Sequence, residues 1–303
     1  MTSRQAEPLS TSHLDARRFG ALEWSETGLI AVIWGASFLF IRVGVEAFGA
    51  GLVPAMRIAF GALALGCLPA ARRPIEARDW PTVAVLGLVW MALPFLLFSL
   101  AERTVPTAIT GMINGAVPLS SAAVAAVWHR RAPSAQRTVA LLFGLAGVTV
   151  IALSVSHDAD TKADTVGVAM LLVGVLCYGI AANVALPLQR KYGALPVLLR
   201  VQLVALTLSL PYAIVTSQTA SFSWIGLGAM FLLGAFGTGL AYAVASTLAG
   251  RTDATRGSIG VFLTPIVATI LGVLVRHEKV PSGAFVGALV VLLGATLTSR
   301  PEP

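Results

Sequence analysis

Polar and aromatic side chains lie at intervals inside long apolar stretches of this 303-residue chain. An amide, hydroxyl or ring head surrounded by hydrocarbon needs a partner, which is either a neighbouring helix or a ligand. The residues of this kind that we expect to bind a small polar molecule are Trp34, Arg57, Trp90, Asn114, Tyr178, Asn183, Thr238 and Tyr242. Bonding between helices is the alternative for each amide, and placement at the membrane interface is the alternative for each aromatic ring.

Two arginines, Arg42 and Arg57, carry formal charge within the first apolar stretches. A guanidinium group can hold a carboxylate or a phosphate through two parallel hydrogen bonds. We therefore expect Arg57 to anchor the ligand if the ligand carries a carboxylate. The alternatives are that these side chains reach the lipid headgroups, or that Arg42 pairs with Glu46, four residues further along.

Pro118 and Pro265 lie near the middle of two apolar stretches. Proline lacks an N–H group and clashes with the carbonyl group four residues earlier, so the carbonyl groups of Asn114 and Val261 should be free of helix bonds. Free carbonyl groups are tolerated in a membrane where they line a wet cavity. We predict that these two prolines act as gating hinges beside the binding site, although single prolines also occur in ordinary membrane helices.

The sequence contains no signature of catalysis or of metal binding. It has no Walker A, HExxH or GxSxG motif, and its four histidines and two cysteines are too scattered for a metal site. None of the 14 acidic residues falls in the middle of an apolar stretch, so proton coupling has no support from the sequence. We expect neither an enzyme nor a bound cofactor or metal, and neither ATP nor nucleic acid as a partner.

These residues require membrane helices to position them. The chain is 56% apolar and 12% charged, against roughly 25% charged residues in soluble domains. An open strand cannot satisfy its backbone in lipid, so we expect an all-α integral membrane protein. Its ten transmembrane helices are predicted at about 26–46, 52–70, 81–101, 106–127, 137–155, 166–188, 195–216, 222–246, 254–275 and 281–299.

The distribution of positive charge predicts the orientation of these spans. Most of the 21 lysines and arginines fall in loops on one side, together with both chain ends. Because this excess stays in the cytoplasm, we expect a multi-pass protein of the cell (inner) membrane with both termini cytoplasmic. The net charge of +7 is then a consequence of topology. We expect residues 1–25 to form a polar cytoplasmic tail, because they lack the apolar core of a signal peptide.

Residues that are 147 positions apart resemble each other. The matched pairs include Gly87 with Gly234, Phe95 with Tyr242, Pro118 with Pro265, and Gly147 with Gly294. A half with five spans is odd in number, so its second copy must enter the membrane from the opposite side. We expect two inverted five-helix repeats, at 26–155 and 166–299, joined by an acidic outer loop at 156–165 and followed by a C-terminal tail at 300–303.

Two segments resemble a known family. The run WGASFLFIRVGVEAFGAGLVPAMRIAFGALAL, from Trp34 to Leu65, is similar to the opening of an EamA repeat of the drug/metabolite transporter (DMT) superfamily. Residues Gly237 to Leu297 resemble the final three helices of that family, with matches at Thr238, Ala241, Tyr242, Pro265, Glu278 and Gly287. In the first half, the position equivalent to Glu278 is Arg131, which departs from the family pattern.

The resemblance implies two halves of opposite orientation, a central cavity, peripheral fifth and tenth helices, and alternating access. We therefore expect an inner-membrane secondary transporter that exports or exchanges a small metabolite, either amino acid-like or another neutral or zwitterionic compound. The alternatives are an uptake permease of the same fold, a channel or lipid-handling protein, and a membrane protein that transports nothing. Substrate, direction, coupling ion and oligomeric state stay open.

Overall fold

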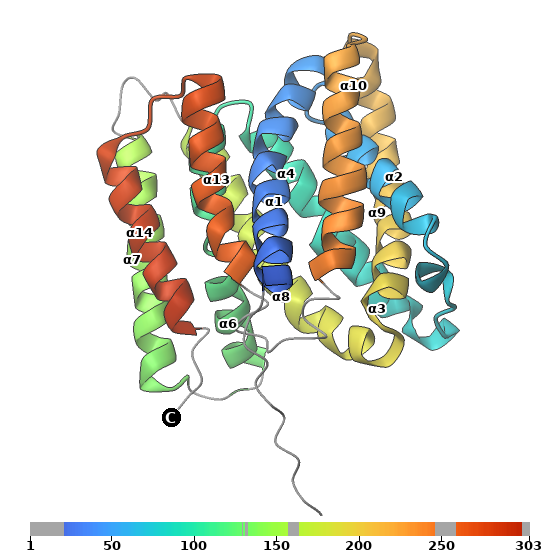
Figure 1. The fold of residues 1–303 in the computed structure, drawn as a ribbon, viewed down its shortest axis with the longest axis horizontal. Coiled ribbons are helices and arrows are strands. Elements are labelled where there is room, and N and C mark those ends of the chain that lie inside the picture. Colours follow the sequence, from blue (N-terminus) through green and yellow to red (C-terminus); the bar gives the residue numbers. More distant parts are fainter. Residues whose placement is uncertain (1–20, 129, 131–132, 157–163, 246–258, 299–303) are drawn as a thin grey trace, which may run out of the picture.

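The computed structural model describes residues 21–128, 130, 133–156, 164–245 and 259–298. The described residues form helices and contain no strand (Figure 1). Helices occupy each of the apolar stretches predicted from the sequence within these limits. Residues 1–20 of the polar tail, Arg131, residues 157–163 of the acidic loop and the C-terminal tail at 300–303 lie outside the described residues.

The helices follow one another along the chain with short connections. The first part contains α1 (Ala21–Phe48), α2 (Leu52–Gly66), η1 (Pro69–Arg72), η2 (Ala77–Asp79), α3 (Trp80–Leu86), η3 (Gly87–Ala92), α4 (Leu93–Ala101), α5 (Thr107–Asn114), α6 (Val117–Trp128) and α7 (Ala135–Ser156). The second part contains α8 (Thr165–Tyr192), α9 (Ala194–Thr216), η4 (Ser217–Thr219), α10 (Trp224–Phe231), η5 (Leu232–Leu240), α13 (Ile259–Arg276) and α14 (Ser282–Thr298).

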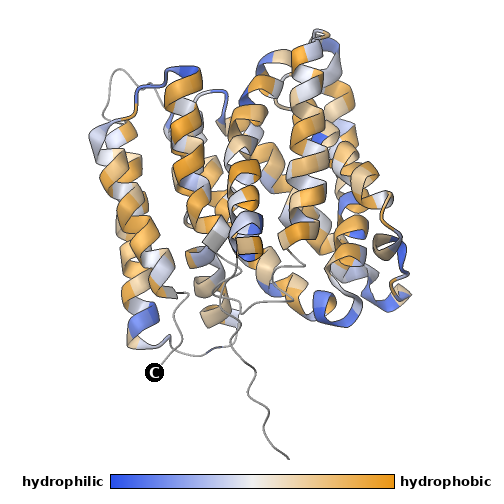
Figure 2. Ribbon diagram, in the orientation of Figure 1, coloured by the Kyte–Doolittle hydropathy of each residue, from blue (hydrophilic) through white to orange (hydrophobic). Residues whose placement is uncertain are grey.

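Length and composition identify the helices that suit a membrane. Seven helical segments in the described residues are long and apolar enough to cross one, and three further apolar helices are shorter, at Leu52–Gly66, Gly260–Arg276 and Ser282–Leu297. Hydrophobic residues follow the middle of the helices, whereas hydrophilic residues gather toward the two ends of the molecule (Figure 2). Large apolar side chains such as Ile225, Leu274 and Leu289 are exposed. The chain is therefore a multi-pass membrane protein.

The most extensive helix contacts join the first part of the chain to the second. α1 packs on α13, and α8 packs on α6 and α4. α2 lies between η5 and α9, and α9 also contacts η3. α7 and α14 pack on each other at one flank of the molecule (Figure 1). The core therefore lies between the two parts, and α7 and α14 are peripheral.

Glycine permits two of these close approaches. A Cβ atom added at Gly287 of α14 would lie 2.7 Å from the carbonyl oxygen of Gly147 in α7. A Cβ atom added at Gly35 of α1 would lie 2.4 Å from the Cβ atom of Val267 in α13. Small residues let membrane helices approach until their backbones touch, which strengthens dispersion contacts where no hydrophobic driving force exists.

Two π-helical segments occupy matched positions. η3 covers residues 87–92, and a shift of 147 residues places it inside η5, which covers 232–240. A π-helical turn uses i→i+5 bonds and often marks a functional site. Both segments carry glycine at the matched positions Gly87 and Gly234.

The two predicted proline interruptions differ from each other. The helix of the fourth apolar stretch breaks at Gly115 and Ala116, between α5 and α6, just before Pro118. α13, in contrast, runs through Pro265 as one helix. Glycine at position 115 loses more entropy in a helix than other residues, and it adds to the effect of Pro118 at this break.

Candidate functional site

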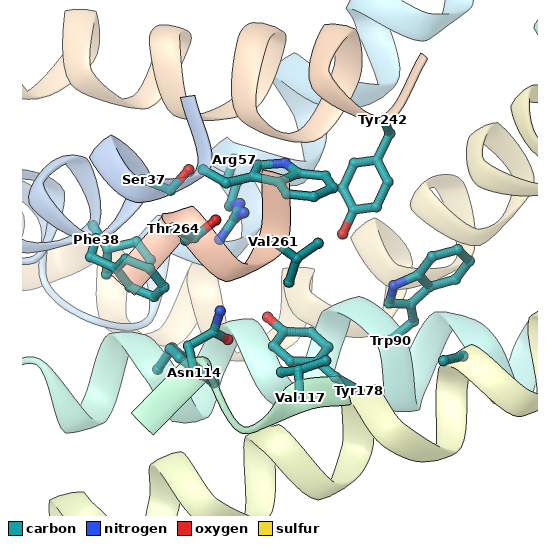
Figure 3. Close-up of a pocket in the computed structure, with 14 residues that line it drawn as sticks. Ser37, Phe38, Arg57, Trp90, Asn114, Val117, Tyr178, Tyr242, Val261 and Thr264 are labelled. Carbon is teal, nitrogen blue, oxygen red and sulfur yellow. The ribbon is translucent and has the colours of Figure 1, made fainter. Parts of the chain in front are cut away.

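A central cavity of about 220 Å³ lies among helices from both parts of the chain. Side chains from these helices converge on it from all sides (Figure 3). The residues that line it are Trp34, Ser37, Phe38, Ile41, Arg57, Trp90, Phe98, Asn114, Val117, Tyr178, Ala182, Tyr242, Val261 and Thr264.

Aromatic rings form much of the cavity wall. The ring of Tyr242 lies between the rings of Trp34 and Trp90, with centroid distances of 5.4 and 5.9 Å. The ring centroids of Phe98 and Tyr178 are 5.7 Å apart. Rings in this arrangement present π faces and polar edges to a ligand, so they can accept a cationic group as well as apolar atoms.

Arg57 brings a positive charge to this wall. Its residue exposure is 8%, and its Nε atom donates a hydrogen bond to Oγ1 of Thr238 at 2.8 Å. Its guanidinium carbon lies 3.8 Å from the centroid of the Phe95 ring. Among the residues that the structure describes, no carboxylate forms an ion pair with Arg57. A buried cation without an acidic partner is costly, and an anionic group that reached it could compensate its charge.

Segment η5 is held in place by side chains from two other helices. The indole Nε1 atom of Trp34 donates to the carbonyl oxygen of Gly237 at 3.0 Å, and Nε2 of Gln202 donates to that of Thr238 at 2.9 Å. The hydroxyl group of Thr238 in turn donates to the carbonyl oxygen of Leu233 at 3.2 Å. These bonds fix the position of the Thr238 hydroxyl group and hence the orientation of Arg57.

The residues four positions before the two prolines both line the cavity. Asn114 lies at the end of α5, beside the helix break, and Val261 lies in the first turns of α13. Pro265 is buried, and its ring lies 2.9 Å from where a Cβ atom at Gly115 would be. Pro118 is half-buried and borders the same break.

The structure brings six of the eight predicted ligand-binding residues to the cavity. These are Trp34, Arg57, Trp90, Asn114, Tyr178 and Tyr242. Thr238 lies behind Arg57 as its hydrogen-bond acceptor. Asn183 instead joins two helices, because its amide nitrogen donates to the carbonyl oxygen of Ser121 in α6 at 3.0 Å.

Other site features carry weaker signals in the sequence. Ser37, Phe38, Phe98 and Thr264 line the cavity but are ordinary residues of apolar helices. Three of them, Ser37, Phe38 and Thr264, fall in the segments that resemble a known family. Arg42 pairs with Glu46 at 3.0 Å, as four-residue spacing on a helix allows. In the described ranges, no group of three or more His, Cys, Asp or Glu residues is placed to hold a metal ion.

Comparison with known proteins shows that the chain matches one protein family along most of its length. The model of the EamA-like transporter family matches residues 28–153 and again residues 165–300. One solved structure, 18% identical, has a TM-score of 0.62 and covers 91% of this chain and 96% of its own. That likeness concerns the fold alone.

Several curated relatives are similar over nearly their whole length. A "Probable terminal-alkyne amino-acid exporter" of Streptantibioticus cattleyicolor is 28% identical over 284 residues, which cover 90% of this chain and 91% of that protein. An uncharacterized transporter of Archaeoglobus fulgidus is 19% identical and covers 92% and 99%. The uncharacterized inner membrane transporter YedA of Escherichia coli K12 is 21% identical and covers 86% and 87%.

Proposed function

Because the chain belongs to the EamA-like transporter family, and is thus a membrane transporter of the drug/metabolite type, we propose that it exports or exchanges a small zwitterionic metabolite. The substrate class is that of an amino acid, and the mechanism is alternating access in the inner membrane. The observation that carries this proposal is Arg57, a buried guanidinium group that lines an aromatic cavity and has no acidic partner among the described residues.

The cavity chemistry supports a zwitterion. A substrate carboxylate would accept hydrogen bonds from the guanidinium group of Arg57. An ammonium group would lie against the rings of Trp34, Trp90 and Tyr242. The volume of about 220 Å³ is below the roughly 300–1,000 Å³ of pockets for drug-sized ligands, which favours a small metabolite.

The other polar side chains complete the site. The amide group of Asn114 and the hydroxyl groups of Tyr178 and Tyr242 would bind the polar atoms of the substrate. Thr238 would contribute by orienting Arg57, and Asn183 by joining α8 to α6 beside Tyr178. We assign no cofactor and no metal to this site.

The transport cycle would use ten spans arranged as two inverted halves, at 26–155 and 166–299. Four observations support this arrangement. Helix pairs that correspond in the two halves make corresponding contacts: α1 packs on α13 as α8 packs on α6, and α2 packs on η5 as α9 packs on η3. The other three are π-helical segments at matched positions, prolines at matched positions, and two successive matches to the family model. The halves would rock about the cavity, with Pro118 and Pro265 as hinges.

Counterflow in proteoliposomes tests this function. Vesicles loaded with one unlabelled amino acid should take up the same labelled amino acid transiently and with saturation, because a carrier alternates between two states. A screen of amino acids, nucleosides and sugars would identify the substrate. Flux that rises linearly with concentration would indicate a channel, and no flux with any of these compounds would contradict the proposal.

Variants of the lining locate the site. Asn114→Ala and Tyr242→Phe should each raise the substrate concentration for half-maximal exchange by about tenfold. A lost hydrogen bond in the site is worth about 0.5–1.5 kcal/mol, and up to about 3 kcal/mol with a charged group. Tyr212→Phe is the matched control, since Tyr212 is exposed on α9 and does not line this cavity. Unchanged exchange in both test variants would place the site elsewhere.

A further inference from the structure

Glu102 is a buried carboxyl group that has no role in the proposed binding of substrate. It follows the end of α4 at Ala101, and its exposed fraction is 0%. Both carboxyl oxygens are buried and have no hydrogen-bond donor within the described parts of the chain. An ionised carboxylate in such a place loses its hydration without compensation. Burial without a hydrogen-bond donor therefore favours the protonated form of this group.

Along the chain, Glu102 lies between residues that line two different cavities. Phe98, one helical turn earlier, lines the central cavity, and the backbone N–H of Glu102 donates to its carbonyl oxygen at 2.9 Å. Arg103, the next residue, lines a second cavity of about 410 Å³. Arg42, Arg276 and Glu278 also line this second cavity.

The charged neighbours of Glu102 are engaged with other groups. Arg42 of α1 donates from its Nη1 atom to the backbone carbonyl oxygen of Glu102, and its Nε atom pairs with Glu46. Arg276, at the end of α13, pairs with the same Glu46 carboxylate. No described arginine donates to the carboxyl oxygens of Glu102. A small movement of α1 or α13 would bring one of these arginines, or water, to the Glu102 side chain.

The other charged groups near Glu102 shift the pKa of its carboxyl group in opposite directions. Both oxygens of Glu278 accept backbone N–H bonds, from Thr107 at 2.8 Å and Ala108 at 2.9 Å, so this carboxylate is held at the start of α5. Burial raises the pKa of Glu102 well above its ordinary value of 4.5; Arg42 lowers it, Glu278 raises it, and Arg57 and Arg276 lower it by smaller amounts. Loss of hydration is the largest of these effects.

We propose that Glu102 is a proton-binding site that controls how the ends of α1, α4 and α13 pack around the second cavity. The carboxyl group holds a proton while these ends are packed as in this structure. When they separate, water or an arginine reaches the carboxylate and the proton leaves to solution. Proton release thus accompanies opening of the path between the two cavities. The link to transport rests on the proposed function, whereas the proton site itself does not.

The proton site is tested by the pH dependence of unfolding in detergent. A carboxyl group whose pKa is raised in the folded protein stabilises it fully below the unfolded value of about 4.5 and loses that contribution as pH rises toward the folded value. The melting temperature of the wild type should therefore fall over this range. Glu102→Gln, which resembles the protonated form, should remove that fall. A Glu102→Gln profile parallel to the wild type would overturn the proton site.

The link to transport is tested by the pH dependence of counterflow. The wild-type exchange rate should rise several-fold as pH increases and Glu102 ionises, whereas Glu102→Gln should exchange slowly at every pH. Asp164→Asn is the matched control: Asp164 is an exposed acid that caps α8, and asparagine caps equally well. It should keep the wild-type profile.

The outcomes separate the two proposals. The melting temperature of Glu102→Gln could lose its dependence on pH while the exchange rate of the same variant keeps the pH dependence of the wild type. That result would overturn the link to opening but not the proton site. Absence of saturable exchange in every variant would contradict the proposed function, while the unfolding profiles would still decide whether Glu102 binds the proton.

Discussion

At the scale of single residues, the orientation of Arg57 in the cavity wall depends on hydrogen bonds to residues that lie behind it. Arg57 is positioned by Thr238, and Thr238 is positioned by a π-helical segment whose carbonyl groups accept bonds from Trp34 and Gln202. A guanidinium group held in one orientation loses less entropy when it binds a carboxylate than one that rotates freely. Affinity for a carboxylate should therefore respond to residues that never touch the substrate.

We expect Thr238→Val to weaken exchange of an amino acid by about tenfold, because a hydrogen bond to a charged group is worth about 1.5–3 kcal/mol. The corresponding amino-acid amide, which has no carboxylate, should lose less affinity. The measurement is the concentration of each compound that halves labelled counterflow. Thr207→Val, at an exposed position of α9, serves as control. Equal losses for the acid and its amide would argue against the role of Arg57.

At the scale of elements, the irregular helices concentrate around the cavity. Trp90 lies in η3, Tyr242 follows η5, and Asn114 ends α5 at the break before α6. The straight helices α7 and α14 pack on each other and contribute no lining residue. Irregular backbone is costly in a membrane unless it is buried in protein or lines a wet space, so we expect the moving part of the molecule to lie beside this cavity.

Pro118→Ala should slow exchange about fivefold and leave the half-saturating concentration unchanged. Alanine supplies an N–H group that can bond the carbonyl oxygen of Asn114, and one bond of about 1 kcal/mol would stiffen the joint between α5 and α6. Pro211→Ala is the control, because Pro211 also lies inside a helix but is exposed on α9. A similar slowing in both variants would remove the hinge assignment.

At the scale of the whole molecule, the two parts of the chain form one core. Helices of the first part pack mainly on helices of the second. The connection between α2 and α3 is also tied to α8 and α9, through Tyr192 with Asp79 at 2.6 Å and Arg200 with the carbonyl oxygen of Ala71 at 2.7 Å. The orientation of this core in the membrane can be tested with the native cysteines.

Cys67 is exposed after the end of α2, whereas Cys177 is buried. With both termini in the cytoplasm, Cys67 lies on the cytoplasmic side. A membrane-impermeant maleimide should therefore label the protein in inverted vesicles and leave it unlabelled in intact cells. Cys67→Ser should abolish labelling, and Cys177→Ser should not change it. Labelling of intact cells through Cys67 would reverse the predicted orientation.

Sequence alone determined the class of protein and identified six of the fourteen residues that line the cavity. Hydropathy over about 20 residues is a local property, so the apolar stretches predicted the helices of the described chain. Polar and aromatic residues inside apolar helices are rare and need partners, which is why residue type and position suffice to identify Trp34, Arg57, Trp90, Asn114, Tyr178 and Tyr242 as lining candidates.

Only the tertiary structure decided which partner each polar residue has. Asn114 and Asn183 look alike in sequence, yet one lines the cavity and the other bonds α6. Glu102 falls at the end of an apolar stretch, as exposed acids do, and packing of helices distant in sequence buries it. Successive residues of a helix point about 100° apart, and the side that faces a cavity is set by neighbours from the other part of the chain.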